Sequence, residues 1–318
     1  MTDLTALVFV AALVGALLID HYLGEPTTRL HPVVWMGNYL NWAAKRLRPN
    51  PSPAVRDLKS FWLAAAFWWA GAALILIAAS AVQWVAFQLP WVLATLLLGA
   101  ALKPMLAWSM LRFEVQAVEM ALAQSLDAGR KRLAMLVSRD TSNLTETEVR
   151  ESAIESLAEN LNDSVVAPIF WFVLFGLPGA AVYRFANTAD AMWGYRGLRH
   201  GVNWEWAGKW AARADDVLSW MPARITALLL KLVSRGVDFK TLSLQARKTP
   251  SPNSGWPMAA MALGLGIRLQ KLGVYALNPS GRPPEPKDVV LAQKKALKVV
   301  VAACLWAQAA ILLIAILK

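Results

Sequence analysis

Long apolar runs alternate with short polar stretches along the whole chain, a pattern typical of helical membrane proteins. A helix needs roughly 20 apolar residues to cross a hydrocarbon core about 30 Å thick. Four runs stand out most clearly. Of these, the run at residues 91–113 is interrupted at Lys103-Pro104, and the run at residues 4–19 is slightly short for a span. Because proline cannot continue a helix through its own ring, Pro90 predicts a tight hairpin between the second and third runs. The four runs are residues 4–19, 61–89, 91–113 and 298–317.

A fifth apolar run, residues 165–183, contains Pro168 and the sequence GLPG, which predict a broken segment. Lys and Arg collect in residues 20–60, so this loop is expected to face the cytoplasm and the N-terminus the outside. If residues 165–183 crossed the membrane fully, the basic stretch 184–295 would lie outside, against that rule. We therefore expect a re-entrant or interfacial segment whose broken backbone is buried in protein.

The pattern between residues 112 and 300 is helical, with apolar residues three and four apart and no convincing strand. Thr145 and Glu148 form a T-x-x-E capping signature before an acidic helix. No clean linker divides the apolar runs. The sequence thus predicts an all-α, polytopic membrane protein with a broken or re-entrant segment and cytoplasm-facing helices, formed by residues 1–318 as a single membrane-embedded domain.

Composition and charge agree with this fold class. The chain is 57% hydrophobic and only 17% charged, and it has 16 tryptophans, more than an ordinary soluble domain would carry. Its net charge of +11 fits basic loops that face an anionic leaflet. No nucleic-acid partner is expected, because no recognised motif accompanies the charge. The single cysteine, Cys304, excludes a disulfide framework, and phosphate-loop, dinucleotide and G-x-S-x-G signatures are absent.

An acidic stripe leads directly into the fifth apolar run. Residues four apart share one helix face, so these carboxylates oppose helix formation unless cations offset them. The simple alternative is a solvated face with Arg139 or Arg150 nearby. Acids beside a membrane are costly and tend to be functional, which favours a site. The stripe consists of Glu151, Glu155, Glu159 and Asp163.

Two further polar clusters combine arginines with small oxygen-bearing side chains. Arginine offers a planar donor fork for phosphate or carboxylate, and carboxylate and amide oxygens suit magnesium. Alternatively, the first cluster is a capped polar helix start and the second a structural ion-pair network. A third motif, SPNSGWP at 251–257, reads equally well as turn chemistry. The two clusters are RFANTADAMWGYR at 184–196 and AARADDVLSWMPAR at 211–224.

These pieces, in this order, resemble the CbiB/CobD family of cobalamin biosynthesis proteins. Any one of them alone is a weak match, but five in register, from about residue 17 to about residue 275, make the match specific. The pieces are LLIDHYLGEPTTRLHPVVWMG, SRDTSNLTETEVRESAIESLAENLNDSVVAPIFW, GLPGAAVYRFANTADAMWGYR, AARADDVLSWMPARITALLL and SPNSGWPMAAMALGLGIRL.

The resemblance implies an integral membrane enzyme, adenosylcobinamide-phosphate synthase. Such an enzyme joins aminopropanol or its O-phosphate to a propionate of adenosylcobyric acid, with ATP and Mg²⁺. It also implies a multi-pass protein of the cell inner membrane, with its active site facing the cytoplasm, near other late cobalamin-assembly enzymes. The sequence leaves open whether the amine carries phosphate and how many copies assemble.

On this resemblance, candidate site residues fall into three groups. The expected catalytic acids are Glu155, Glu159, Asp163 and Asp190. The expected magnesium ligands are Glu155, Asp163 and Asp190, although magnesium usually takes only one or two protein carboxylates. The expected substrate- or phosphate-binding residues are Arg139, Asp140, Asn160, Arg184, Asn187, Thr188, Tyr195, Arg196, Arg213, Asp215, Asp216, Arg224, Asn253 and Trp256.

Two other function classes are compatible with a polytopic chain. AmpE-like sensor proteins are distant members of the same superfamily, but a sensor need not keep the acidic stripe and both arginine clusters together. Transporters often contain broken helices with polar groups in the membrane. Against a transporter, the chain has only about four clear spans and no visible inverted repeat. The ligase is the favoured interpretation.

Overall fold

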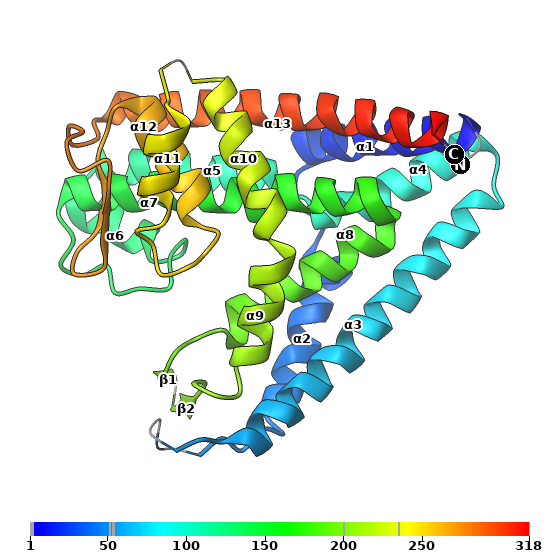
Figure 1. Ribbon diagram of the computed structural model, residues 1–318, viewed down its shortest axis with the longest axis horizontal. Helices are drawn as coiled ribbons and strands as arrows, with labels where there is room; N and C mark the ends of the chain where they lie inside the picture. The colour runs from blue at the N-terminus through cyan, green and yellow to red at the C-terminus, as the bar shows by residue number, and fades with distance from the viewer. Residues whose placement is uncertain (1–2, 51, 53–54, 200, 235, 318) are drawn as a thin grey trace. The chain divides into compact units, whose positions relative to one another are not determined.

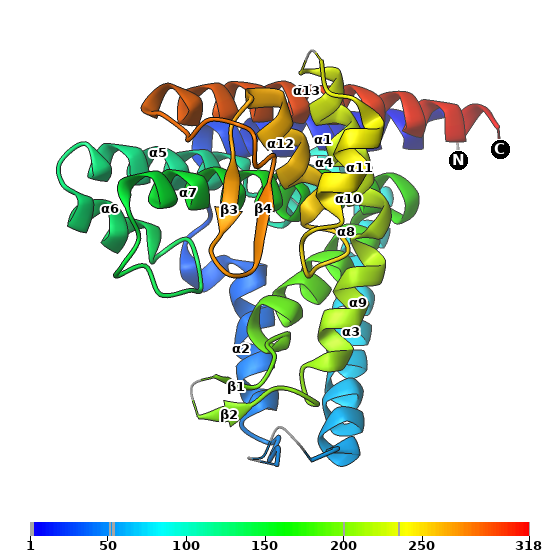
Figure 2. The ribbon, with the colours of Figure 1, turned by 60° about the vertical axis from the view of Figure 1, so that its left-hand side comes forward.

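The computed structural model describes residues 3–50, 52, 55–199, 201–234 and 236–317, which are predominantly helical (Figures 1 and 2). This confirms the predicted all-α class. The chain forms two compact units, each assembled from segments that are distant in sequence. The expectation that residues 1–318 act as one domain stays a prediction. The first unit comprises Met1–Leu106, Ala167–Leu218 and Ala307–Lys318, and the second Ala107–Val166 and Ser219–Trp306.

The first unit contains the early apolar runs and the segment predicted to be broken. Pro90 lies directly between two of its helices, which confirms the predicted hairpin. A short 3-10 turn replaces regular helix at Lys103-Pro104, as the interruption in the third run predicts. Its elements are α1 (Asp3–Leu23), η1 (Thr28–Leu30), α2 (Pro32–Ala44), α3 (Leu58–Phe87), α4 (Trp91–Leu102), η2 (Lys103–Met105), α8 (Ala167–Trp193), β1 (Leu198–Arg199), β2 (Val202–Asn203) and α9 (Lys209–Leu218).

The second unit contains the acidic helix and the C-terminal half of the sequence motifs. A helix that begins in this unit, α13 (Pro286–Ile316), ends in residues of the first. A π-helical turn, η3, follows the acidic helix. The remaining elements are α5 (Trp108–Leu122), α6 (Leu126–Leu133), α7 (Glu146–Leu161), η3 (Asn162–Val166), α10 (Trp220–Leu232), α11 (Phe239–Ala246), α12 (Gly255–Leu265), β3 (Leu269–Lys271) and β4 (Tyr275–Leu277).

Within the described residues, five helical segments are long and apolar enough to cross a membrane, so the chain is a multi-pass membrane protein. Four of them match the apolar runs picked out in the sequence. The fifth includes the run at 165–183, which continues without a loop from α7 through η3 into α8. The segments are Leu4–Leu23, Leu58–Phe87, Trp91–Leu122, Glu146–Trp193 and Pro286–Ile316.

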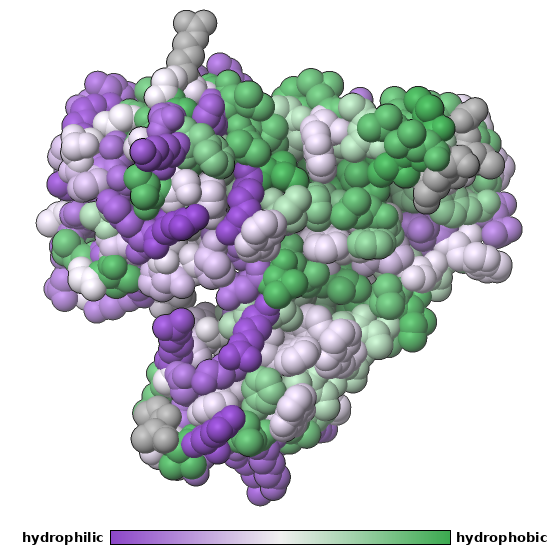
Figure 3. All heavy atoms as spheres, in the orientation of Figure 1, coloured by the Kyte–Doolittle hydropathy of each residue, from purple (hydrophilic) through white to green (hydrophobic). Residues whose placement is uncertain are grey.

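The surface of these segments is apolar, as a bilayer requires. Helix α3 exposes large hydrophobic side chains along its length, among them Trp62, Ile77 and Trp84, each more than 60% exposed. Figure 3 shows hydrophobic residues gathered over the second half of α13 and over α8, whereas hydrophilic residues gather over the β1–β2 hairpin and α9. Exposure on this scale is the signature of a lipid-facing surface, since soluble proteins rarely leave large apolar patches uncovered.

Two local features refine the sequence analysis. The capping box is confirmed, because Thr145 Oγ1 accepts from the Glu148 N–H while the Glu148 carboxylate accepts from the Thr145 N–H. The prediction that the chain contains no strands is wrong in detail. Strand β1 pairs with β2, and β3 pairs with β4, each pair as a short antiparallel hairpin. Strands of two or three residues are too short to produce a detectable alternation of polar and apolar positions.

The predicted break in the fifth run lies at Gly176 in α8. Its backbone has φ +67° and ψ −154°, outside the helical region, and Pro178 follows. The freed N–H of Leu177 donates to the side-chain oxygen of Gln83 on α3 at 2.8 Å. A Cβ on residue 176 would lie 2.2 Å from that same oxygen. Broken backbone inside an apolar segment is tolerated here because a neighbouring helix supplies the missing acceptor.

A buried ionic cluster joins the end of α1 to α2 and η2. Lys103 is 2% exposed, and its Nζ lies 2.6 Å from Glu25 Oε2 and 3.3 Å from Asp20 Oδ1. His31 accepts from the Val33 N–H through Nδ1, so its Nε2 carries the proton and donates to Glu25 at 3.0 Å. The polar residues that follow the first apolar run therefore take part in a buried ion-pair network.

Replacing Gln83 with leucine leaves the Leu177 N–H buried without an acceptor, which costs about 1–3 kcal/mol. We expect a lower free energy of unfolding for Gln83→Leu, measured by thermal or denaturant unfolding in detergent. Gln88→Leu is the control, because Gln88 is exposed and bonds only weakly, to Trp84 O at 3.5 Å. Equal stability of the two variants would contradict the role given to Gln83.

The ionic cluster also predicts a pH dependence. Burial raises the pKa of the Glu25 carboxyl, but hydrogen bonds and charge from His31 and Lys103 more than offset it, so the pKa lies below its ordinary value. A depressed pKa stabilises the fold above the ordinary value, and this contribution is lost as pH falls through the depressed pKa.

Between about pH 5 and pH 3, the free energy of unfolding should therefore fall more steeply in the wild type than in Glu25→Gln, which cannot titrate. Unfolding in detergent across this range measures the difference. Asp127→Asn is the control, since Asp127 is 80% exposed. Parallel slopes for the wild type and Glu25→Gln would show that the cluster does not hold the carboxyl charged.

Candidate functional site

The acidic stripe of α7 lies on a buried face. Glu151 is 0% exposed and Glu155 is 6% exposed, so the alternative of a solvated face is wrong for these two residues. Glu159 is half-buried, and Asp163 lies in η3, two residues beyond the end of α7 at Leu161. Carboxylates at such positions need partners within the protein, because burying an unpaired charge is costly.

Arginines from distant segments of the second unit supply these partners. Arg268 Nε donates to Glu151 Oε1 at 3.2 Å, and Arg139 Nη2 lies 3.7 Å from Glu155 Oε2. Arg139 also donates to the Ser152 hydroxyl. The sequence-based expectation that cations offset the stripe is confirmed. Arg150, the other arginine considered, instead makes a bidentate pair with Glu119.

The β3–β4 hairpin adds a tyrosine that the sequence analysis missed. The Tyr275 hydroxyl hydrogen-bonds the Glu155 side chain, and Lys271 on the paired strand contributes a positive charge. Burial, together with the charges of Glu155 and Glu159, raises the pKa of the Tyr275 phenol, so it stays protonated and acts as a donor. Only the pairing of these two short strands brings Tyr275 and Lys271 to the acidic helix.

One carboxylate oxygen of Glu155 accepts no hydrogen bond from the protein. Its Oε1 is buried and has no hydrogen-bond partner, although Oε2 faces Arg139. A buried oxygen in this condition is the natural place for a proton, a substrate N–H or a metal ion. Nearby, Asn160 Nδ2 donates to Ser156 O at 3.0 Å and Asp163 Oδ1 accepts from Asn162 at 2.8 Å, so both are held by their own helix.

The donor set fits magnesium only in part. Carboxylate oxygens suit the ion, and Glu155 Oε1 is available. Across the part of the chain that the structure describes, no three His, Cys, Asp or Glu side chains form a group that could hold a metal. The predicted set of three ligands includes Asp190, which belongs to the other compact unit. Glu155 or Asp163 is thus the protein ligand to consider, because eight residues along the helix separate the two too far for one ion, and water or substrate oxygens would complete the shell.

The motifs at 220–224 and 251–257 meet elsewhere in the second unit. Arg224 donates to Asn253 Oδ1 at 2.8 Å and to backbone carbonyls, and its guanidinium lies 5.0 Å from the centre of the Trp256 ring. The structure thus brings together three predicted binding residues, in a tie between α10 and the start of α12. Asp140 is exposed and accepts from the Ser142 N–H, which is turn chemistry.

A separate polar pocket of about 310 Å³ lies in the first unit, between the end of α8 and α9. It collects the predicted Tyr195, Arg196, Arg213 and Asp216 around two glycines. Glu205 and Lys209 also line it and were missed in the sequence, where they stand apart from either arginine cluster. Burial raises the pKa of the Asp216 carboxyl, and the charge of Arg196 opposes this shift in part. The lining residues are Gly194, Tyr195, Arg196, Glu205, Gly208, Lys209, Ala212, Arg213 and Asp216.

Close packing behind this pocket requires its glycines. A Cβ on Gly208 would lie 1.9 Å from Trp193 O, and one on Gly194 would lie 1.9 Å from Asp190 Oδ1. Asn187 Nδ2 donates to Asp215 Oδ1 at 3.3 Å and so ties α8 to α9. The pocket is therefore held by backbone and side-chain contacts.

Three other predicted site residues lie along α8: Arg184, Thr188 and Asp190. Thr188 donates to Arg184 O at 2.7 Å within this helix. Chemically, the pocket offers three cations for phosphate or carboxylate, whereas the second unit offers a buried acid with one available oxygen.

Comparison with known proteins identifies a consistent set of relatives. A family model described as "CobD/Cbib protein" matches residues 13–303. The chain is 40% identical over 278 residues to a probable cobalamin biosynthesis protein CobD of Methanothermobacter thermautotrophicus, covering 85% of this chain and 86% of that one. It is 36% identical over 294 residues to the cobalamin biosynthesis protein CobD of Brucella anthropi, covering 84% and 86%. No solved structure matches the chain.

The polar pocket between α8 and α9 should bind phosphate-like anions, because Arg196, Lys209 and Arg213 line it. We expect Arg196→Gln and Arg213→Gln each to weaken binding of inorganic pyrophosphate about tenfold, because a charge-assisted hydrogen bond contributes about 1.5–3 kcal/mol. Isothermal titration calorimetry on detergent-purified protein measures this. Arg46→Gln is the control, since Arg46 stacks on Trp42 outside the pocket. Unchanged affinity in both pocket variants would rule out an anion site here.

Proposed function

Because the chain belongs to the CobD/Cbib family and therefore acts in cobalamin biosynthesis, we propose that it is an ATP-dependent amide ligase. It joins (R)-1-aminopropan-2-ol, or its O-phosphate, to a propionate carboxylate of adenosylcobyric acid. The product is adenosylcobinamide or its phosphate. The observation that carries the proposal is the buried Glu155, whose Oε1 has no partner while Arg139 and Tyr275 hold the rest of the carboxylate.

The chemistry explains why such a site needs both cations and an acid. A carboxylate repels nucleophiles, and oxide is a poor leaving group. In the proposed reaction, a propionate oxygen takes the terminal phosphoryl group of ATP, which releases ADP. The amine nitrogen then attacks the acyl carbon, the C–O bond to phosphate breaks, and the nitrogen loses one proton. Cations stabilise the phosphate charge in both steps, and a base accepts the proton.

The buried acid of the second unit and the polar pocket of the first have different proposed roles. Within the second unit, Arg139 beside Glu155 stabilises the charge of the acyl phosphate. The polar pocket of the first unit is a separate anion site, because Arg196, Arg213 and Lys209 are exposed or half-buried cations around it. Glu155 accepts the proton of the attacking amine at its available oxygen, and the Tyr275 hydroxyl orients the carboxylate. Magnesium, if held by Glu155 or Asp163, would neutralise phosphate charge.

The cellular setting is part of the proposal. The proposed polar site faces the cytoplasmic side of the inner membrane, where ATP is available, and the excess of Lys and Arg in the loops supports this orientation. The fifth apolar run enters the membrane without crossing it fully, which its break at Gly176 permits. A membrane location keeps the corrinoid intermediate close to the enzymes of the following assembly steps.

The decisive experiment is product formation. Purified protein in detergent, with adenosylcobyric acid, ATP, Mg²⁺ and either amine, should yield one condensation mass that is absent without ATP. Glu155→Gln should lower kcat by about 100-fold or more, the scale of general base catalysis. Glu146→Gln on the same helix is the control, because Glu146 is 58% exposed.

The outcomes separate the function classes. No product from folded wild-type protein would contradict the ligase. Full activity of Glu155→Gln would leave the ligase standing but move the base elsewhere. In cells, a ligase is needed for growth on cobyric acid and dispensable for growth on cobinamide, whereas a sensor or a transporter predicts no such split.

A further inference from the structure

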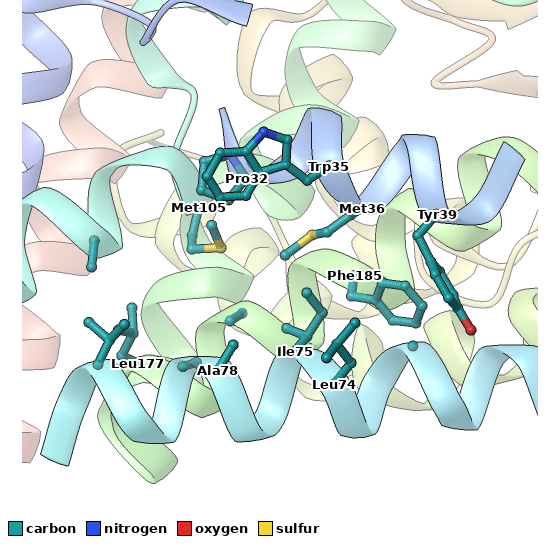
Figure 4. A pocket seen from close by; sticks show the side chains of 15 residues that line it. Pro32, Trp35, Met36, Tyr39, Leu74, Ile75, Ala78, Met105, Leu177 and Phe185 are labelled. Atoms are coloured by element: carbon teal, nitrogen blue, oxygen red, sulfur yellow. The ribbon is translucent and has the colours of Figure 1, made fainter. Parts of the chain in front are cut away.

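An apolar cavity of about 360 Å³ lies in the first unit, apart from the polar pocket (Figure 4). Figure 4 shows its lining side chains between α2 and α3, with Tyr39 and Phe185 at one end and Leu177 toward the other. All of the lining residues are hydrophobic or glycine: Pro32, Trp35, Met36, Tyr39, Gly71, Leu74, Ile75, Ala78, Ala79, Val82, Ala101, Met105, Leu177, Ala181 and Phe185.

The cavity wall offers no polar group to a ligand. Only two lining side chains can form hydrogen bonds, and both are already engaged. Tyr39 donates its hydroxyl to Phe67 O at 2.7 Å, and Trp35 donates its indole N–H to Arg29 O at 2.9 Å. A water molecule in a cavity needs two to four polar partners, so water is a poor occupant. The occupant that fits is a hydrocarbon.

The cavity is elongated along a membrane helix. Its lining positions on α3 extend from Gly71 to Val82, about 17 Å at a rise of 1.5 Å per residue. Leu74 lines the cavity and is also 58% exposed, so the cavity opens on the face of α3 that carries lipid-facing residues such as Ile77. A long, narrow, side-opening space of this kind suits a single extended chain.

Small residues create this space. Gly71 lies against the ring pair at one end: a Cβ there would be 2.4 Å from Phe185 Cζ and 2.6 Å from Tyr39 Cε1. Ala79 and Ala181, both buried, leave room where α3 and α8 face each other. An unfilled apolar cavity forfeits dispersion contacts along its whole wall, which favours an apolar occupant.

We propose that this cavity is a binding site for one hydrocarbon chain of a membrane phospholipid. The lipid packs between α2, α3 and α8 as a structural component of the first unit. The inference does not depend on the ligase reaction, because it rests only on the shape, the lining and the membrane setting of these helices.

Photo-crosslinking tests the site directly. The protein is reconstituted in vesicles of phosphatidylglycerol and phosphatidylethanolamine that contain a phospholipid with a diazirine in one acyl chain. We expect label at cavity positions such as Ile75 and Val82, in addition to exposed Ile77. The double substitution Ala79→Leu with Ala181→Leu should remove label from the cavity positions and leave label at Ile77. Ala73→Leu, on the same helix outside the cavity, should change neither.

A second readout covers the case in which the double variant does not fold. Lipid that stays with extensively washed wild-type protein is extracted and identified by mass spectrometry. Retained phospholipid supports the proposal. Retained isoprenoid quinone in its place, label confined to Ile77, or cavity label that survives in the folded double variant would each overturn it.

Discussion

Polar groups removed from water must find their partners inside the protein, and this constraint organises the whole structure. It explains why a glutamine side chain closes the gap in α8, where Gly176 frees the Leu177 N–H. The same rule explains why Lys103 is enclosed by two carboxylates. On α7 it pairs Glu151 with an arginine 117 positions away in sequence. Each of these contacts lets a span helix carry a group that hydrocarbon would reject.

This constraint divides the candidate chemistry into two kinds. The Glu155 carboxylate is buried, where Arg139 and Tyr275 fix its orientation and shield it from bulk water. The cations of the polar pocket are more exposed, where they can attract anionic substrates to a protein of net charge +11. Exposed cations suit the binding of phosphate, and a buried acid suits proton transfer, so each unit carries a different kind of candidate chemistry.

Much of this fold could be read from the sequence. Apolar run lengths predict the spans, Pro90 and the GLPG stretch predict the breaks, and the T-x-x-E signature predicts the start of α7. These features are local, so a few neighbouring residues determine them. The four-residue spacing of the carboxylates likewise predicts one acidic face, and the resemblance of five motifs predicts the family that the comparisons confirm.

The partners of those residues could not be predicted, because they arrive from far along the chain. Tyr275 and Lys271 reach Glu155 through a hairpin whose strands have three residues each. Lys209 enters the polar pocket from a helix start outside the recognised motifs. Conversely, Arg150 is a neighbour of the stripe in sequence yet binds Glu119. Spacing predicts which side chains share a face, whereas tertiary packing decides which charges meet.

The proposed ligase activates a carboxylate with phosphate and passes the acyl group to an amine. The most direct measurement uses adenosylcobyric acid labelled with ¹⁸O in the reacting propionate. If the carboxylate oxygen takes the phosphoryl group, one ¹⁸O appears in the inorganic phosphate for each amide formed. Amide formation with unlabelled phosphate would contradict this activation, and phosphate release without amide would contradict the ligase itself.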